Sequence, residues 1–225
     1  MDKIRCKFRA GLSLVELVIT IMISSIIALS VGVLLIGGQR SWQQTYEDAN
    51  SKMRQDSYAI MSAFGSVGRK SNRLGYTLYN QTGSAFHEAE PQHGGGDEIV
   101  YGDAVEFRYW SSSVPTSDLL DVTNTGTDYA FFYVDNGKLK VDYGTCPPGA
   151  ITGGANGTRN TSDITTMTLA ENVVPDPNGL FNHTVVGGAG QGCVRINLTL
   201  ESDEEGSDEQ IRVLTATLAR NIWPR

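Results

Sequence analysis

One long apolar run near the N-terminus constrains this chain more than any other feature of its sequence. The run lies between Gly11 and Gly38 and contains a single charged residue, Glu16. About 20 consecutive apolar residues are enough for a helix to span a bilayer, so the run predicts a transmembrane helix. A carboxylate in such a span costs on the order of 2–3 kcal/mol near the bilayer centre and less toward the interface. Glu16 therefore indicates a function beyond anchoring.

The short basic segment before the run, residues 1–11, has three interpretations. A cleaved secretory signal peptide fits poorly, because its apolar region has roughly 7–15 residues and a small-residue cleavage site follows it. An uncleaved signal anchor fits the length, and the basic residues would hold the N-terminus in the cytoplasm. In the third interpretation the chain is cut between Gly11 and Leu12. That cut creates a new α-amino group on Leu12 and makes Glu16 the fifth residue of the mature chain.

The residues at this junction resemble the class III signal of type IV pilins and type II secretion pseudopilins. The shared arrangement is a basic leader, Gly11, the sequence Leu12-Ser13-Leu14-Val15-Glu16-Leu17 and a long apolar run. The resemblance implies that a prepilin peptidase cuts after Gly11 and methylates the new N-terminus at Leu12. It also implies that Glu16 pairs with the N-terminal amine of a neighbouring subunit during filament assembly. The chain departs from the family at Leu12, where phenylalanine is usual, and near Val33, where many major pilins have proline.

Small residues follow Glu16 through the apolar run at intervals of four positions. They are Thr20, Ser24, Ala28 and Gly32. Small residues allow helix backbones to approach closely in an apolar medium, so we expect this ridge to be a helix-packing surface. The alternative explanation is that such residues are simply tolerated in membrane spans.

A helical pattern continues beyond the run, with apolar residues spaced three and four apart and charged or amide residues between them. The apolar stripe consists of Trp42, Tyr46, Ala49, Met53, Ile60 and Ala63, interrupted by Asp56. Gly65 and Gly68 predict the end of the helix. We therefore expect one helix from Leu12 to about Phe64, with a transmembrane and assembly half at residues 12–38 and an amphipathic half at 39–66.

Residues 67–225 predict a β-rich globular domain in the periplasm or outside the cell. Period-two alternation indicates strands, and Asn136-Gly137 is a strong signal for a hairpin between two of them. The expected strands are Ile99–Trp110, Tyr129–Val134, Lys138–Tyr143, Val194–Leu200 and Ile211–Trp223, with irregular loops at Gly144–Ser162 and Gly187–Gly192. An antiparallel sheet of four to six strands packed on the helix gives an α+β fold. The resemblance implies that this fold is pilin-like.

Two of the three cysteines, Cys146 and Cys193, lie beyond the membrane segment, and Cys6 lies in the leader. A pair of cysteines in an oxidising compartment predicts one disulfide bond between Cys146 and Cys193. Two buried free thiols are the alternative.

Charge and motifs argue against several classes of function. The net charge is −7, and it becomes −10 without residues 1–11, so nucleic acid is not an expected partner. No nucleophile elbow or zinc-ligand spacing accompanies the three histidines, so we expect no catalytic site, metal or other cofactor. Calcium, which some pseudopilins bind, has a weak candidate site in Asp203, Glu204, Glu205, Asp208 and Glu209, but their spacing matches no twelve-residue calcium loop. A solvated hairpin tip explains these acidic residues better.

Two classes of function remain. The first is a structural subunit of a type IV pilus or type II secretion pseudopilus. It would reside first in the bacterial inner membrane with its N-terminus in the cytoplasm, and its partners would be prepilin peptidase, the inner-membrane assembly platform and sister subunits. Length and the segments Leu169–Val173, Val194–Leu198 and Thr217–Asn221 loosely resemble minor subunits of the PilW or pseudopilin J kind, which form tip or initiation complexes. The second class is a membrane-anchored periplasmic or surface binding domain, such as an adhesin, that does not polymerise.

Overall fold

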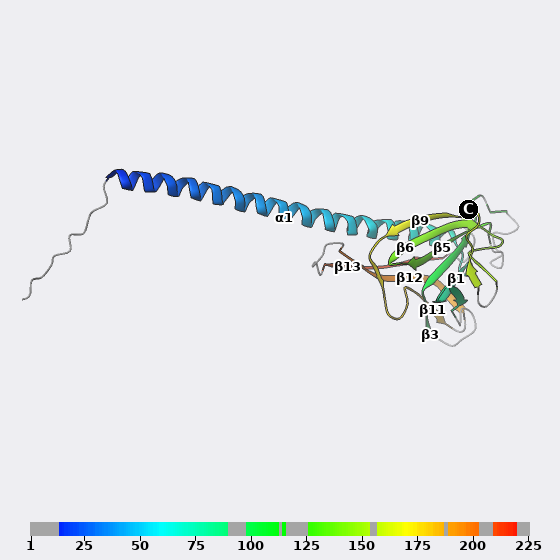
Figure 1. The fold of residues 1–225 in the computed structure, drawn as a ribbon. Helices are drawn as coiled ribbons and strands as arrows, with labels where there is room; N and C mark the ends of the chain where they lie inside the picture. The colour runs from blue at the N-terminus through cyan, green and yellow to red at the C-terminus, as the bar shows by residue number, and fades with distance from the viewer. Residues whose placement is uncertain are drawn as a thin grey trace, which may run out of the picture. The chain divides into compact units, whose positions relative to one another are not determined.

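The computed structural model describes residues 14–89, 98–112, 114–115, 126–153, 157–186, 189–202 and 209–219, with the backbone alone at 44–50 and 189–191. The chain divides into two compact units, Met1–Asp48 and Ala49–Arg225. Helix α1, Leu14–Lys70, contributes residues to both units, and the strands all belong to the second (Figure 1). The α+β class predicted from the sequence is confirmed.

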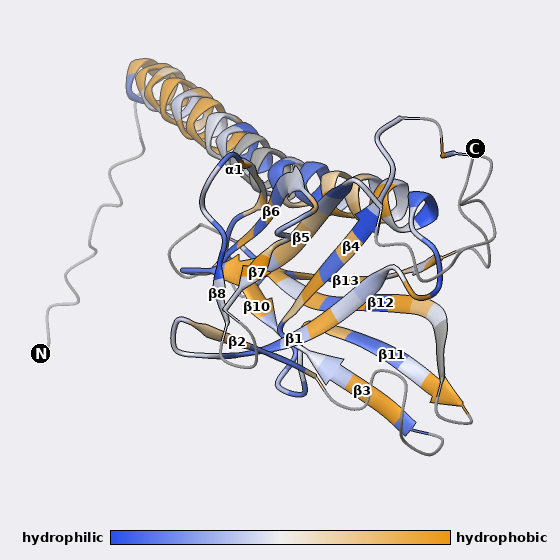
Figure 2. Ribbon diagram, turned by 90° about the vertical axis from the view of Figure 1, so that its right-hand side faces the viewer, coloured by the Kyte–Doolittle hydropathy of each residue, from blue (hydrophilic) through white to orange (hydrophobic). Residues whose placement is uncertain are grey.

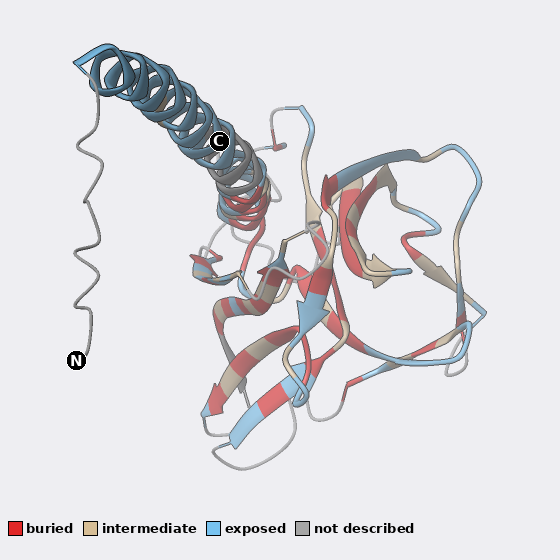
Figure 3. Ribbon diagram, turned by 60° about the vertical axis from the view of Figure 1, so that its left-hand side comes forward, coloured by how far each residue is buried: buried red, intermediate tan, exposed pale blue. Residues whose placement is uncertain are grey.

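The described part of the first unit, residues 14–48, belongs to α1. Residues Leu14–Gln43 form a stretch of 30 residues that is long and apolar enough to cross a membrane. All of these residues are exposed except Gly32, which is half-buried. Figure 3 shows the exposed colouring of this part of the helix. The strongly apolar character of the same stretch is visible in Figure 2. The prediction of one membrane-compatible helix near the N-terminus is therefore confirmed.

The part of α1 in the second unit buries one stripe. The buried side chains, spaced four and three apart, are those of Met53, Ser57, Ile60, Phe64 and Val67. Met53 and Ile60 confirm the predicted stripe, and Ala63 packs against the core although it is only partly buried. The prediction for Trp42 is wrong, because its side chain is 79% exposed. Tyr46 and Ala49 lie outside the residues whose side chains are described.

The helix also extends past its predicted end. It continues to Lys70, so Gly65 and Gly68 lie inside its last two turns. At Gly68 a Cβ atom would stand 2.1 Å from the Thr217 side chain, so the absence of a side chain lets the helix approach strand β13 closely. Gly68 is thus a packing residue of the helix rather than its terminator.

Two antiparallel sheets form the rest of the second unit. The first has eight strands in the order β7-β8-β2-β1-β4-β5-β6-β9. In chain order these are β1 (Tyr76–Thr82), β2 (Ala85–Glu88), β4 (Ala104–Tyr109), β5 (Asp128–Asp135), β6 (Lys138–Thr145), β7 (Ile151–Thr152), β8 (Gly157–Arg159) and β9 (Thr165–Ala170). The second has five strands, β3 (Glu98–Gly102), β10 (Val173–Pro175), β11 (Phe181–Val186), β12 (Ala189–Glu201) and β13 (Gln210–Leu218). In it β12 pairs with β13 on one side and with β10 and β11 on the other, and β11 also pairs with β3.

The prediction of four to six strands is wrong, because the described part of the chain contains thirteen. Several of the additional strands are too short to show a period of two, and β7 and β8 lie inside the predicted loop Gly144–Ser162. The predicted loop Gly187–Gly192 likewise contains the start of β12. The hairpin prediction is confirmed, since β5 and β6 pair across Asn136 and Gly137, which have φ angles of 51° and 70°.

The predicted strand Ile99–Trp110 is in fact two strands in different sheets. It is divided after Gly102, where a Cβ atom would stand 3.1 Å from both Leu78 Cβ and the Tyr79 carbonyl oxygen. The next residue, Asp103, accepts a hydrogen bond from the Gln81 backbone N–H through its carboxylate. These contacts turn the chain from β3 in one sheet to β4 in the other.

One hydrophobic core joins the buried stripe of α1 to the facing sides of both sheets. Phe64 lies at its centre, with ring centroids 5.4 Å from Phe107, 5.6 Å from Phe132 and 5.8 Å from Phe181. The first two phenylalanines belong to the eight-stranded sheet and the third to the five-stranded sheet. Figure 2 shows these two layers of strands with the end of α1 beside them. A second, smaller core lies on the other face of the eight-stranded sheet.

Candidate functional site

Glu16 stands in the first turn of α1 as the single acidic residue of the apolar stretch. An acidic side chain in a first turn interacts favourably with the partial positive charge of the helix N-terminus. The apolar side chains around it are exposed, among them Val15 at 64% and Leu17 at 52%. This part of the helix therefore presents a carboxylate within a surface that requires lipid or other helices to cover it. The predicted processing residues Gly11 and Leu12 lie outside the described residues.

The predicted ridge of small residues is accessible along the same stretch of helix. Thr20, Ser24 and Ala28 are exposed, and a Cβ atom added at Gly32 would meet nothing within 4 Å. The Thr20 hydroxyl donates a hydrogen bond of 2.7 Å to the Glu16 carbonyl oxygen. Because that hydroxyl is satisfied within its own helix, it can face an apolar neighbour without a desolvation cost.

The two cysteines expected to form a disulfide are both free thiols. Cys146 packs against the second core, on the face of the eight-stranded sheet that points away from the five-stranded sheet. Cys193 belongs to β12 in the five-stranded sheet. The two cysteines are thus associated with different sheets, and the predicted disulfide bond is not formed. Burial is the main cause that raises the pKa of the Cys146 thiol to about 11.

The segment that includes β7 and β8 covers two buried carboxylates on the outer face of the eight-stranded sheet. Glu106 is 1% exposed and accepts hydrogen bonds from Arg108 Nε at 2.6 Å and from the Tyr79 hydroxyl at 3.2 Å. Asp142, also 1% exposed, accepts a bond of 2.6 Å from Arg159 Nη1, and the same guanidinium lies over the Tyr133 ring.

Each of these carboxylates has a guanidinium partner, so neither is a free acid available for catalysis. Burial, with the nearby Asp142 carboxylate, raises the pKa of Tyr133 to about 12, which keeps that phenol neutral. Since Arg159 belongs to β8, its bond to Asp142 holds the covering segment on the sheet. Sequence reasoning missed this arrangement, because the glycine- and threonine-rich composition of the segment indicates only a loop.

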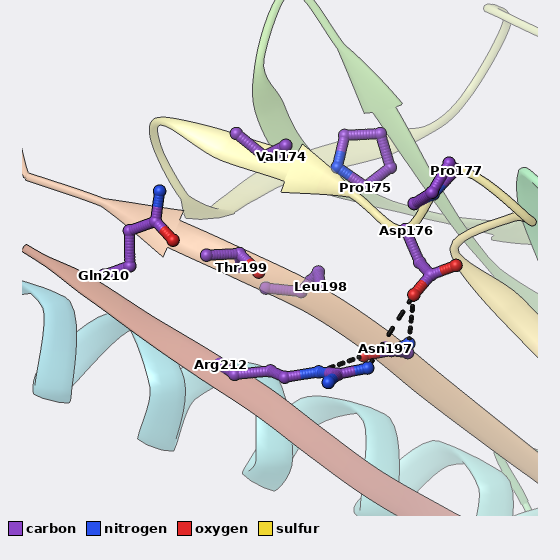
Figure 4. A pocket seen from close by; sticks show the side chains of 9 residues that line it. All are labelled: Val174, Pro175, Asp176, Pro177, Asn197, Leu198, Thr199, Gln210 and Arg212. Carbon is purple, nitrogen blue, oxygen red and sulfur yellow. Dashed lines mark hydrogen bonds and ion pairs between the residues drawn. The ribbon is translucent and has the colours of Figure 1, made fainter. Parts of the chain in front are cut away.

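A groove opens on the outer face of the five-stranded sheet, with a volume of about 490 Å³ (Figure 4). Asn197 of β12 occupies its floor. It donates a hydrogen bond of 2.7 Å to Asp176 through Nδ2 and accepts one of 3.1 Å from Arg212 Nε through Oδ1. An apolar wall lies beside these hydrogen-bonded side chains and is formed by Val174, Pro175 and Pro177. The arrangement suits small uncharged polar groups, because its acid and its base neutralise one another.

The described residues contain no cluster of three or more His, Cys, Asp or Glu side chains that could hold a metal ion. Of the acidic residues weighed for calcium, Asp203, Glu204, Glu205 and Asp208 lie outside the described residues. His183 is fully buried, and its Nδ1 lies 2.7 Å from the Tyr76 hydroxyl in the main core.

The apolar part of α1 is thus the strongest candidate site, since it combines a carboxylate with an extended exposed apolar surface. Comparisons of the chain with protein-family models, with curated proteins and with solved structures give no match.

Proposed function

We propose that this chain is a minor subunit of a type IV pilus or of a type II secretion pseudopilus. One observation carries the proposal: the junction from Gly11 to Leu17 is followed at once by a helix that is exposed and apolar from Leu14 to Gln43. A helix of this kind requires either lipid or other apolar helices around it. A filament core made of such helices supplies the second environment, and the membrane supplies the first.

The proposed mechanism has three steps. Prepilin peptidase removes residues 1–11 and methylates Leu12, and the helix then waits in the inner membrane with the globular unit in the periplasm. The assembly platform extracts the helix, and Glu16 pairs with the α-amino group of Leu12 on a neighbouring subunit. The attraction between the two charges offsets the cost of removing both from water, and it also fixes the axial register of the helices.

The second unit supports a place at the tip of the filament or in its initiation complex. It spans Ala49–Arg225, and the described part of it contains two sheets with thirteen strands. In a filament interior each globular part is confined by neighbours above and below, whereas a terminal subunit has neighbours on one side only. We also propose that the fold is an enlarged pilin-like arrangement, in which the second part of α1 packs against both sheets.

Mass spectrometry of the mature N-terminus tests the processing step. We expect a chain that begins at Leu12 and carries one added methyl group. An intact leader, or a new N-terminus beyond Gly38, would contradict the pilin assignment and favour a membrane-anchored binding domain that does not polymerise.

Substitution of Glu16 tests the assembly step. We expect Glu16→Ala and Glu16→Gln to remain folded and membrane-bound but to be lost from purified filaments or from complexes with sister subunits. Glu98→Gln, an exposed acidic residue of β3, is the matched control and should co-assemble normally. Undiminished co-assembly of both Glu16 variants would remove this carboxylate from the mechanism.

A further inference from the structure

We propose that Arg40 and Trp42 fix the outer boundary of the membrane span, and that Glu16 then lies in the headgroup layer of the opposite leaflet. The proposed depth concerns the membrane-resident protein, and only its consequence for assembly rests on the proposed function. It assigns a lipid partner to the side chains of Arg40 and Trp42.

The outer end of the span has a sharp change in composition. Leu17–Ile36 is free of charged residues, and Gly37, Gly38 and Gln39 then lead to Arg40. Trp42 follows two residues later with 79% of its side chain exposed, although the apolar pattern of the sequence places it on the buried stripe. An exposed tryptophan in water leaves a large apolar area uncovered, whereas at a membrane interface its ring is covered and its N–H stays hydrated.

Arg40 adds a charge to the same boundary. A long basic side chain at the end of a span keeps its stem along apolar surface and extends its head to the lipid phosphates. A tryptophan and an arginine within one turn therefore hold the helix at a defined depth.

Helix geometry then fixes the depth of Glu16. At 1.5 Å per residue, Leu17–Ile36 is about 30 Å long, which equals the thickness of the hydrocarbon core. Glu16 and Trp42 are separated by about 39 Å along the helix axis, and by about 37 Å along the bilayer normal at a typical tilt of about 20°. Both values exceed the core thickness, so Trp42 at one interface requires Glu16 to lie at the other.

This depth changes the energetic role of the carboxylate. In the headgroup layer Glu16 remains hydrated, so the membrane-resident protein does not bear the cost of a charge at the bilayer centre. The carboxylate loses water only when the helix leaves the lipid and packs against other helices. A charge partner is then needed during assembly but not while the protein resides in the membrane.

Depth-dependent fluorescence quenching tests the position of Trp42. The full chain with Trp110→Phe and Trp223→Phe keeps one tryptophan, and it is reconstituted into vesicles of phosphatidylcholine and phosphatidylglycerol brominated either near the headgroup or near the acyl-chain end. We expect shallow bromines to quench Trp42 about twofold more strongly than deep ones, because interfacial aromatic residues lie at headgroup level. The control variant moves the tryptophan to mid-span through Trp42→Phe with Ile27→Trp, and its preference should reverse. Stronger quenching of Trp42 by deep bromines, or no quenching by either, would overturn the proposal.

A fluorescent label tests the position of Glu16 without altering it. An environment-sensitive dye is attached to Val15→Cys, or to Ile27→Cys as the mid-span control, after the native cysteines are replaced by serine. We expect the dye at position 15 to report a polar environment and the dye at position 27 an apolar one. In the variant Arg40→Gln/Trp42→Ala the environment at position 15 should shift, because the outer anchor is lost. Equal emission at positions 15 and 27, or no shift in the anchor variant, would contradict the proposed placement of Glu16 and Trp42 at opposite interfaces of the membrane.

Discussion

The two parts of α1 are both helical, but the first exposes its apolar residues and the second buries them. Between Leu14 and Gln43 the helix is predominantly apolar, and all of its residues except Gly32 are exposed. In the second unit its apolar residues recur at intervals of four and three, and they are buried against both sheets. Helix formation alone therefore does not indicate whether a stretch is exposed or buried against a sheet. The distribution of apolar residues around the helix does indicate it.

Glycines show the same contrast on a smaller scale. Gly32, Gly37 and Gly38 have open space where a Cβ atom would stand, whereas at Gly68 a Cβ atom would meet Thr217 at 2.1 Å. In the first part of the helix these residues leave space for partners outside the chain. In the second part, the space that a Cβ atom of Gly68 would need is occupied by Thr217 of the same chain.

The largest effect we expect is from removing the first part of the helix. A chain of residues 44–225 should be monomeric and folded in buffer without detergent, because the second unit has its own core. The full chain should require lipid or detergent. Ultracentrifugation combined with thermal unfolding checks both expectations, and aggregation or loss of cooperative unfolding in the truncated chain would show that the two parts are not independent.

A core substitution in the second part of α1 should have the next largest effect. Phe64→Ala removes a fully buried ring at the centre of three aromatic contacts and should lower the free energy of unfolding by about 3–5 kcal/mol. Tyr58→Ala is the matched control on the same helix, since Tyr58 is 69% exposed and its loss should cost less than about 0.5 kcal/mol. Urea unfolding of residues 44–225 measures both values, and similar values for the two variants would contradict the assigned buried stripe.

A pair of glycines three residues apart provides a finer test. Gly68→Ala forces a methyl group against Thr217 and should destabilise the second unit by roughly 1–3 kcal/mol. Gly65→Ala meets only the end of the Arg69 side chain at 3.7 Å and should stabilise the helix by roughly 0.5–1 kcal/mol.

Adding Thr217→Ala to Gly68→Ala should restore part of the lost stability, because it removes the two nearest atoms and leaves Cβ. Urea unfolding of the single and double variants measures the coupling between the two positions. Equal effects of Gly65→Ala and Gly68→Ala, or strictly additive effects in the double variant, would contradict the close approach of α1 to β13.

Local patterns predicted the elements whose causes are local. The Asn136-Gly137 hairpin follows from two residues that adopt positive φ angles, and the alternation of Val194, Ile196, Leu198 and Leu200 in β12 follows from one buried sheet face. The membrane-compatible helix is equally local, because length and composition alone define it.

Features that depend on distant residues could not be predicted in this way. The division of Ile99–Trp110 into β3 and β4 depends on packing of Gly102 against β1. Cys146 and Cys193 remain free thiols, and they are associated with different sheets. Asp142 pairs with Arg159, which belongs to a segment whose sequence shows no strand pattern. For the candidate site, the sequence placed Glu16 and the ridge on one helix, but the exposure of Trp42 required the structure.

The smallest effect we expect concerns an ion pair that connects the second part of α1 to the sheet. Glu171 accepts hydrogen bonds from Lys138 Nζ of β6 at 2.5 Å and from Lys52 Nζ of α1 at 3.0 Å, and these partners, Lys138 first, lower its pKa. A lowered pKa in the folded state means that the ion pair contributes stability above the ordinary carboxyl pKa, and that this contribution is lost as the pH falls through the lowered value. Because the side chains are exposed, the gain is modest and is weakened by salt.

Glu171→Gln should therefore lower the unfolding midpoint of residues 44–225 slightly at pH 7 in low salt. The difference from the unaltered chain should shrink at acidic pH and at high ionic strength. Glu98→Gln, exposed on β3, is the control for the loss of one exposed negative charge. Thermal unfolding across pH and salt measures the difference, and a Glu171→Gln effect that persists unchanged at acidic pH would mean that packing, rather than charge, connects the helix to the sheet at this position.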